Sequence, residues 1–419
     1  MTEQIQSNFS PIKVVLLGLD LGQFDPDRSM DELSALCQAN NMEAVAQLVQ
    51  KKAAPEPGTV LGEGKLAEAR LYCQNLEAEA AVFDGELSGS QIRNISDALG
   101  VEVLDRTMLI LEIFRSRAVT NEGKVQTELA LLRYRLPRLA GLGESLSRQG
   151  GGGGGGGGAR RGAGESKLEY DRRHIHRRIE ALEQKLAELE KRRGENRRAR
   201  QKAGTPVISL VGYTIVGKSS LLNALCGADL LEADMLFATL DPTARKLTLP
   251  SGLAVIAVDT VGFVSRLPHK LVEAFKSTLE EAAYSDVIVK VADAADEERD
   301  TQLEVTDQVL GELGCNEIPQ LIVYNKCDKA GAVPFHPGVL LTSAKTGLGL
   351  PALLTALDEA LADRVRAVKL LLPYDKLSLA EPMRSRGSVT VEDYREGGVY
   401  FEGFVKSTDL YLYLPYLQE

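Results

Sequence analysis

Residues 212–219 read Gly-Tyr-Thr-Ile-Val-Gly-Lys-Ser and match the pattern Gly-x-x-x-x-Gly-Lys-Ser. In this pattern two glycines let the backbone N–H groups curve around phosphate oxygens. Lys218 is then expected to reach the β- and γ-phosphates, and the Ser219 hydroxyl to hold Mg²⁺. The pattern predicts a nucleoside triphosphate site formed by Gly212, Tyr213, Thr214, Ile215, Val216, Gly217, Lys218, Ser219 and Ser220.

A second polar group selects the base. Asn325-Lys326-Cys327-Asp328 follows an apolar run, and a carboxylate such as Asp328 accepts hydrogen bonds from both N1–H and the 2-amino group of guanine. Adenine does not offer these two donors in that arrangement. A base that leaves the carboxylate without a hydrogen-bond donor is rejected strongly. Downstream, Ser343-Ala344-Lys345 is typical of the backbone clasp of guanine. The two groups together favour GTP over ATP.

Between these motifs, Asp259-Thr260-Val261-Gly262 ends another apolar run. Here the aspartate is expected near Mg²⁺, usually through water, and the glycine N–H near the γ-phosphate. The preceding polar connection predicts the first switch segment, with Thr239 as the second hydroxyl ligand of Mg²⁺. Thr243 is the fallback, and for both threonines an ordinary loop position is the alternative. The switch residues assigned to the nucleotide are Phe237, Ala238, Thr239, Leu240 and Asp241.

Phe263 stands where many GTPases carry the glutamine that orients the attacking water. A phenyl ring has no hydrogen-bonding group, so the sequence identifies no catalytic residue. Arg245 and Arg266 flank the switches without an evident role. We therefore predict slow intrinsic hydrolysis that a partner or a rearranged loop completes.

Each motif follows a run with strand character, namely residues 206–211, 253–258, 319–323 and 339–342. Loops at the ends of parallel strands meet at one edge of a sheet, so residues 204–364 are predicted to form a Ras-like P-loop GTPase domain.

Residues 1–120 are predicted as an α/β domain, because strand and helix patterns alternate between 12 and 112. The expected strands are 12–17, 43–49, 80–83 and 101–104, and the expected helices are 30–39, 64–78 and 88–99. We interpret Gly62-Glu63-Gly64-Lys65 as a turn. Residues 365–419 predict a small α+β appendage of the βαββ kind: a strand over 370–374, a short helix, and strands within 387–394 and 398–405. Its final residues Tyr411, Tyr413 and Tyr416 are expected to pack.

Residues 121–203 predict an antiparallel pair of helices joined by a glycine-rich loop. Apolar residues recur at helical spacing from Val125 to Leu136 and from Ile175 to Leu189. Between them lie nine consecutive glycines, 150–158, and we expect the loop to extend to Gly164 because glycine offers no side chains to pack.

The helical region carries a charge opposite to the rest of the chain. Residues 133–203 contain 19 Lys and Arg against 9 Asp and Glu, whereas the remaining residues contain 30 against 50. Such asymmetry indicates a basic element that binds polyanions, since arginines neutralise phosphates and stack on bases. A solvated spacer is the alternative. The RNA-contact candidates are Arg160, Arg161, Arg172, Arg173, Arg177 and Arg178.

The 419 residues are 44% hydrophobic and 26% charged, which is typical of a globular protein of several domains. No apolar run approaches the length of a membrane span, and residues 1–13 do not resemble a signal peptide. Five cysteines form no zinc pattern and are expected to be buried or incidental thiols. We expect a cytoplasmic protein that acts as a monomer.

These motifs, in this order, resemble the HflX-type GTPases of the Obg-HflX group of translation GTPases. The resemblance covers about residues 58–412 and includes Leu136-Pro-Arg-Leu139 and Ser145-Leu-Ser-Arg148 outside the nucleotide motifs. It implies a GTPase that binds the large (50S) ribosomal subunit and splits or rescues stalled ribosomes under stress, with the helical hairpin directed toward the peptidyl-transferase region.

Two positions depart from the family. Ile215 replaces the usual asparagine, so potassium-stimulated hydrolysis is not expected, and the glycine run is purer than the family's loop. ATP hydrolysis by an N-terminal region occurs in some members, but no site for it is visible in this sequence. Two other hypotheses remain open. One is a regulatory GTPase switch acting on a protein or membrane partner, and the other is a structural coiled-coil protein with a vestigial pocket.

Overall fold

The computed structural model of the protein describes residues 10–139, 159–203, 205–227, 243–264, 281–331, 336–362, 365–385 and 389–418. The chain divides into two compact units. One lies within residues 1–187 together with 268–274, and the other comprises the rest. Each unit is described separately below. The predicted division into four domains at residues 120, 203 and 364 stays a prediction.

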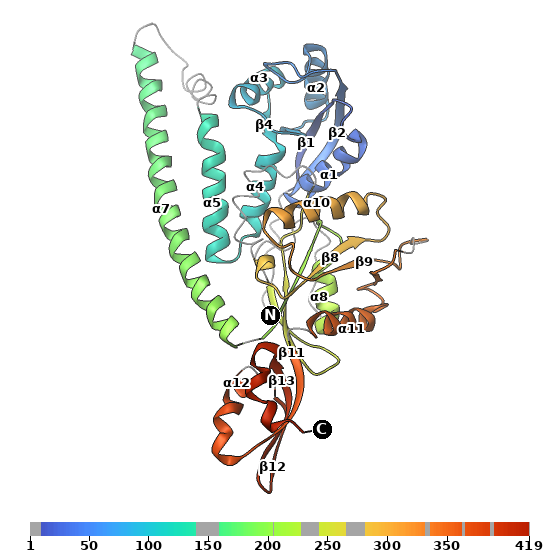
Figure 1. The fold of residues 1–419 in the computed structure, drawn as a ribbon. Coiled ribbons are helices and arrows are strands. Elements are labelled where there is room, and N and C mark those ends of the chain that lie inside the picture. Colours follow the sequence, from blue (N-terminus) through green and yellow to red (C-terminus); the bar gives the residue numbers. More distant parts are fainter. Residues whose placement is uncertain are drawn as a thin grey trace. The chain divides into compact units, whose positions relative to one another are not determined.

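The N-terminal unit contains a four-stranded parallel sheet in the order β2-β1-β3-β4 (Figure 1). Its strands are β1 (Ile12–Asp20), β2 (Met42–Lys51), β3 (Ala80–Phe83) and β4 (Glu102–Asp105). Residues 14–17 of β1 are fully buried, because a central parallel strand is covered on both faces and must be apolar throughout. The predicted α/β unit with a mainly parallel sheet is confirmed.

The crossover helices of this unit are α1 (Pro26–Ala39), α2 (Glu63–Asn75) and α3 (Gly89–Leu99), and α4 (Arg106–Arg117) follows the last strand. The predicted turn over residues 62–65 is wrong, since α2 begins there. Gly62 occupies the N-cap position in extended conformation, and its N–H donates to Oε1 of Gln50 over 2.8 Å. Glu63 then lies in the first turn, where a negative charge favours the helix dipole.

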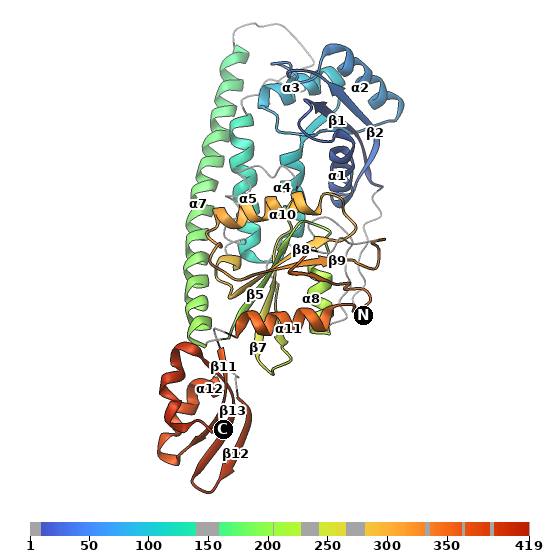
Figure 2. The same ribbon diagram turned by 45° about the vertical axis from the view of Figure 1, so that its right-hand side comes forward.

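Two helices follow, α5 (Asn121–Arg135) and the long α7 (Ala159–Ala203), with a short 3-10 turn η1 (Leu136–Arg138) after α5. In both views α5 and the first part of α7 lie side by side and run in opposite directions, as the apolar spacing predicts (Figures 1 and 2). Ile179 and Leu182 of α7 are buried in this pairing. Arg178 pairs with Glu128 and Arg133 with Glu183, each at 2.7 Å across the two helices.

The loop predicted to extend to Gly164 is too long by six residues. Helix α7 already begins at Ala159, because alanine and arginine are good helix formers and the apolar repeat continues downstream. The nine glycines 150–158 lie outside the described residues. Of the helices described, none is both long and apolar enough to cross a membrane.

The second unit contains a six-stranded sheet in the order β10-β9-β8-β5-β7-β6, with only β6 antiparallel to its neighbour (Figure 2). Its strands are β5 (Val207–Gly212), β6 (Thr243–Thr248), β7 (Ala254–Asp259), β8 (Val287–Asp293), β9 (Gln320–Asn325) and β10 (Val339–Leu341). The helices described around it are α8 (Lys218–Cys226), α10 (Arg299–Glu312) and α11 (Leu350–Leu361). Every nucleotide motif in the described residues follows the carboxyl end of one of these strands, as predicted.

A three-stranded antiparallel sheet in the order β11-β13-β12 completes this unit. It comprises β11 (Val365–Leu372), η2 (Tyr374–Ala380), α12 (Glu381–Ser385), β12 (Val389–Arg395), β13 (Gly398–Lys406), η3 (Ser407–Leu412) and η4 (Leu414–Tyr416). The βαββ prediction is confirmed, although the first strand ends before Pro373, which has no N–H for the ladder. Tyr413 is buried and its hydroxyl donates to the carbonyl of Leu379, whereas Tyr411 is exposed.

Candidate nucleotide-binding site

The loop between β5 and α8 has the geometry of a phosphate cradle. Gly217 caps α8 in the left-handed region at φ 90°, and a Cβ on it would lie 2.5 Å from Nδ2 of Asn325. Only glycine fits here, because any side chain would strike the motif predicted to read the base. The N-terminal end of α8 follows directly, and such an end attracts anions.

Lys218 is buried at the centre of this loop. Its Nζ donates to the carbonyls of Gly212 at 3.0 Å and Tyr213 at 2.7 Å, so the backbone holds the ammonium inside the loop. Burial lowers the pKa of Lys218 to about 8, and the nearby Asp259 carboxylate opposes this shift. A phosphate at this position would supply negative charge to an ammonium that burial has removed from water.

The Ser219 hydroxyl donates to Oδ2 of Asp259. The carboxylate lies at the end of β7 and the hydroxyl in the first turn of α8, so tertiary structure brings together two oxygen ligands separated by 40 positions. Oxygen ligands of this kind, a carboxylate and a hydroxyl beside a phosphate cradle, are the ones that Mg²⁺ prefers. Thr260 faces away from them and donates to the carbonyl of Leu210 over 2.7 Å.

The Asp-x-x-Gly segment is joined to the phosphate loop by its backbone. The Phe263 N–H donates to the Gly212 carbonyl at 3.0 Å, and the Thr214 N–H donates to the Phe263 carbonyl at 2.7 Å. Gly262 lies so close that a Cβ on it would be 2.8 Å from Cα of Thr214 and 3.0 Å from Nζ of Lys218. The Phe263 ring is buried, so this residue contributes its backbone to the site.

Ile215 adopts the left-handed conformation at φ 63° and is 43% exposed. This conformation is unfavourable for a β-branched residue and readily accepted by asparagine. Ile215 therefore offers no amide oxygen at this position and places an unsuitable side chain on a strained backbone.

Asn325 links three parts of the predicted site. Its Nδ2 donates to the Val216 carbonyl at 3.0 Å in the phosphate loop, and its Oδ1 accepts from the Ala344 N–H at 3.1 Å. The Thr342 hydroxyl also lies 3.4 Å from Oδ1. One buried amide thus fixes the phosphate loop, the Asn-Lys-x-Asp motif and the Ser-Ala-Lys segment in a single arrangement.

The remaining residues of the two base motifs lie beside it. Lys326 donates to Oδ2 of Asp293 at 2.7 Å. Asp328 accepts a 2.6 Å hydrogen bond from the Ser343 hydroxyl, which lowers the pKa of that carboxyl below its usual value. The Cys327 N–H donates to the Thr342 carbonyl, and its thiol faces the Tyr324 carbonyl. An ionised carboxylate is the form that can accept from both N–H groups of guanine.

Other predicted site residues are placed only in part. The first-switch residues 237–241 lie outside the described residues. Thr243, the fallback for Thr239, is an exposed residue at the start of β6 opposite Asp259. Arg160 and Arg161 lie in α7, without a description of their side chains. Arg172, Arg173, Arg177 and Arg178 are all exposed on α7. Of these, Arg178 forms an ion pair with Glu128 of α5.

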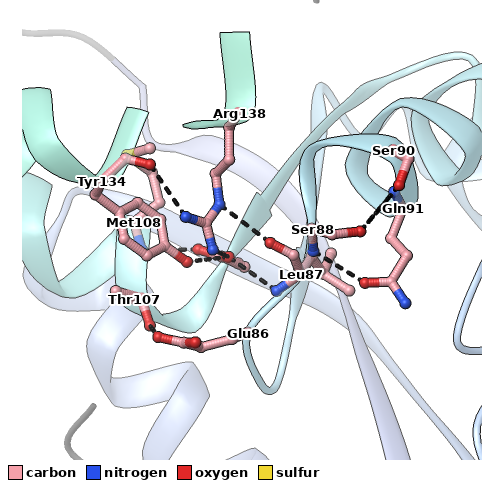
Figure 3. Close-up of polar contacts among 10 residues, drawn as sticks. Glu86, Leu87, Ser88, Ser90, Gln91, Thr107, Met108, Tyr134 and Arg138 are labelled. Carbon is pink, nitrogen blue, oxygen red and sulfur yellow. Dashed lines mark hydrogen bonds and ion pairs between the residues drawn. The ribbon is translucent and has the colours of Figure 1, made fainter. Parts of the chain in front are cut away.

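A buried polar network at the end of α5 was not predicted from the sequence (Figure 3). Asp105 is fully buried and accepts from the N–H groups of Leu87 at 3.1 Å and Met108 at 2.8 Å, and from the Tyr134 hydroxyl. Burial raises the pKa of Asp105, and these donors oppose the rise. Burial and the adjacent carboxylate also raise the pKa of Tyr134.

Arg138 closes this network. Its Nε donates to the Leu87 carbonyl and its Nη1 to the Tyr134 carbonyl, both at 3.0 Å, and its guanidinium stacks on the Tyr134 ring at 3.5 Å. The network ties the end of α5 to the loop that follows β3 and to the junction between β4 and α4. The available signal was Leu136-Pro-Arg-Leu139, where a family motif holds an arginine directly after a helix.

Three of the five cysteines lie in the cores of the two units, away from the nucleotide motifs. Cys37, Cys73 and Cys315 are buried, and burial raises the pKa of Cys37 to about 12. No group of three His, Cys, Asp or Glu side chains that could hold a metal occurs within the described ranges.

The fold is similar to that of a crystallised GTP-binding protein from Sulfolobus solfataricus in complex with GDP. The likeness covers 83% of this chain and 98% of that one, at 25% identity and a TM-score of 0.46.

Three family models match in succession. They are described as GTP-binding GTPase N-terminal at residues 27–115, GTP-binding GTPase Middle Region at 117–200 and 50S ribosome-binding GTPase at 207–326.

Three relatives share the name GTPase HflX. The protein from Caldanaerobacter subterraneus is 48% identical over 90% of this chain and 87% of its own length. That from Lacrimispora saccharolytica is 43% identical over 97% and 96%. That from Escherichia coli is 40% identical over 84% of each. Identity of this extent over most of each chain shows that the chain belongs to the HflX family of GTPases, which bind and hydrolyse GTP.

Proposed function

We propose that this GTPase associates with the large (50S) ribosomal subunit and splits or rescues stalled ribosomes under stress, with GTP bound by the residues of the phosphate loop and the two base motifs. The position of Asn325 carries the nucleotide part of this proposal. A single amide there joins the phosphate loop to the segment predicted to clasp guanine. Asp328, ionised and exposed beside Ser343, selects guanine over adenine.

Mg²⁺ fits the same site. Ser219 and Asp259 would hold it, directly or through water, with Thr239 as the further hydroxyl. The bound ion supplies charge neutralisation at the β- and γ-phosphates. Lys218 adds a second positive charge from inside the loop.

The proposal includes slow hydrolysis of GTP by the isolated protein. Phe263 has no group that can orient water, and its ring is buried. The Phe263 carbonyl also accepts the hydrogen bond of the Thr214 N–H. The segment that contains Phe263 must therefore separate from the phosphate loop before the Thr214 N–H can donate to a phosphate oxygen. A partner that stabilises the separated form accelerates turnover.

Two observations favour the large ribosomal subunit as that partner. The family model that matches residues 207–326 is described as a 50S ribosome-binding GTPase. Arg172, Arg173 and Arg177 are exposed on α7, in the basic part of an acidic chain, where they can neutralise phosphates.

The proposal is tested by GTP turnover with and without purified large subunits. We expect strong acceleration, at least tenfold, which corresponds to about 1.4 kcal/mol of the activation barrier. Asp328→Asn is the matched control, because its amide donates where the carboxylate accepted. The variant should lose GTP turnover and gain turnover of xanthosine triphosphate, whose 2-oxo group replaces the amino group.

Large subunits should accelerate the Asp328→Asn variant with xanthosine triphosphate as they accelerate the wild type with GTP. Unchanged wild-type turnover with subunits would contradict the ribosomal part. Normal GTP preference in the variant would contradict the assignment of the base. The alternative, a switch acting on a protein or membrane, predicts turnover that subunits do not change.

A further inference from the structure

Helix α7 carries one aromatic residue among its 45, and that residue is exposed. Tyr170 has 67% of its surface accessible to solvent. Arg173, His174 and Arg177 follow it at three, four and seven positions, and all three are exposed. On a helix these spacings place the four side chains on one face.

This face is directed away from the helix pairing. At 3.6 residues per turn, positions 170, 173, 174 and 177 fall opposite Ile179 and Leu182, which are buried against α5. Among the described residues, Tyr170 therefore takes no part in the packing of α7 against α5.

The described charges on this face are positive, whereas the acidic Glu169 and Asp171 flank Tyr170 on the neighbouring faces of the helix. Arg173 lies 3.8 Å from Glu169, in an exposed ion pair of little strength. Arg177 extends the positive face by another turn, and His174 lies beside it. A phosphate group can replace the weak Glu169 contact, because an exposed ion pair contributes at most about 1 kcal/mol.

We propose that Tyr170 stacks on an unpaired RNA base while Arg173 and Arg177 neutralise the phosphates on either side. This inference rests on the proposed ribosomal function and names the site on α7 that recognises RNA. An aromatic ring beside cations is an arrangement that binds single-stranded nucleic acid, since every base has a face on which to stack. A membrane would require a broad apolar face, whereas the neighbours of Tyr170 are arginine and histidine.

The chain contains no tryptophan, so a single substitution makes the stacking visible. In Tyr170→Trp the new indole is the sole tryptophan of the full-length protein. We expect an unstructured oligouridylate to quench its fluorescence strongly and an RNA duplex of equal length to quench it little. Tyr394→Trp is the matched control, because Tyr394 is 69% exposed on β12. Its fluorescence should not change with either RNA.

Affinity provides the second readout. Tyr170→Leu should weaken binding of the oligouridylate by about 5- to 100-fold, as the loss of one stacked base predicts. Tyr170→Phe should bind like the wild type because it keeps the ring. The effect should persist in high salt, where phosphate contacts weaken and stacking does not. An unchanged midpoint of thermal unfolding in Tyr170→Leu excludes a folding defect.

Wild-type affinity in Tyr170→Leu, or equal quenching at positions 170 and 394, overturns the inference. So does a blue shift of the Tyr170→Trp emission on binding to anionic phosphatidylserine vesicles, with no quenching by RNA. The proposed function fails separately, through turnover that large subunits leave unchanged. If subunits accelerate Tyr170→Leu with the wild-type dependence on concentration, the ribosomal function stands and the stacking role falls.

Discussion

At the scale of the residue, Lys218 shows what burial adds to a sequence motif. The motif specifies a lysine, whereas the structure removes that lysine from solvent and leaves its pKa at about 8 rather than 10.5. The free site therefore holds an ammonium whose desolvation is incompletely compensated, and a triphosphate supplies the missing charge.

This gives a prediction about pH. Between pH 8 and 10.5 the folded free protein has lost a proton that the unfolded chain still holds, so the stability of the free protein rises with pH in that window. GTP binds the protonated form, so its affinity should fall above about pH 8, by at most tenfold for each pH unit. Calorimetry at pH 8.5 in two buffers should detect proton uptake on binding.

Lys218→Met is the control for this experiment, since it keeps the base pocket and with it any effect of guanine ionisation. The variant should bind GTP weakly, without proton uptake at pH 8.5. Equal proton uptake by both proteins would show that Lys218 does not titrate on binding.

At the scale of the element, the polar network around Asp105 holds the end of α5 against the N-terminal sheet. A buried carboxylate is tolerated there only because N–H and O–H donors surround it. Arg138, at the end of η1, adds a guanidinium at 3.8 Å. The last described residues before the glycine-rich segment are therefore anchored by hydrogen bonds as well as by apolar packing.

Tyr134→Phe should lower the free energy of unfolding of the N-terminal unit by about 1–3 kcal/mol, because the ring still fits and Asp105 loses one buried donor. Urea unfolding of the full chain, monitored by hydrogen exchange of the amides of residues 106–135, measures this loss. Tyr411→Phe removes a hydroxyl from an exposed ring and should change stability by less than about 0.5 kcal/mol. Equal effects of the two changes would contradict the role of the network.

At the scale of the whole molecule, charge is segregated. The net charge of −10 combines a basic region at residues 133–203 with an acidic remainder. A polyanion should therefore bind α7 while the rest of the surface repels it, and such binding weakens with salt because counterions are released from the nucleic acid.

We predict the effect of changing four arginines to Glu: Arg172, Arg173, Arg177 and Arg178. Co-sedimentation with large subunits at moderate salt should be lost. Any binding that remains at low salt should depend less on salt concentration than wild-type binding does. Reversal of Lys51, Arg366, Lys369 and Lys376, which are also exposed, makes the same change in net charge and serves as the control. It should leave subunit binding near the wild-type level. Similar losses in both variants would mean that total charge, rather than α7, controls association.

Much of the fold was predictable because local patterns and global structure agree. Strands such as β1 and β5 are apolar runs, and the phosphate loop lies between a strand and a helix as its motif requires. The errors were local. Helices α2 and α7 begin at Glu63 and Ala159, where glycine-rich composition indicated a turn and a loop, because the residues downstream outweigh the propensity of single glycines.

The amino-acid sequence by itself determined the nucleotide class, the order of the motifs, the helical hairpin and its positive charge, since each depends on residue types at short spacing. Tertiary structure alone decided that Asn325 bonds to the phosphate loop, that Lys218 is desolvated, that Tyr134 and Arg138 surround Asp105, and that Tyr170 faces away from the α5 pairing. These contacts join positions up to about a hundred residues apart. Hydrogen bonds and burial between such positions arise only when the sheets and helices are assembled, so no short pattern encodes them.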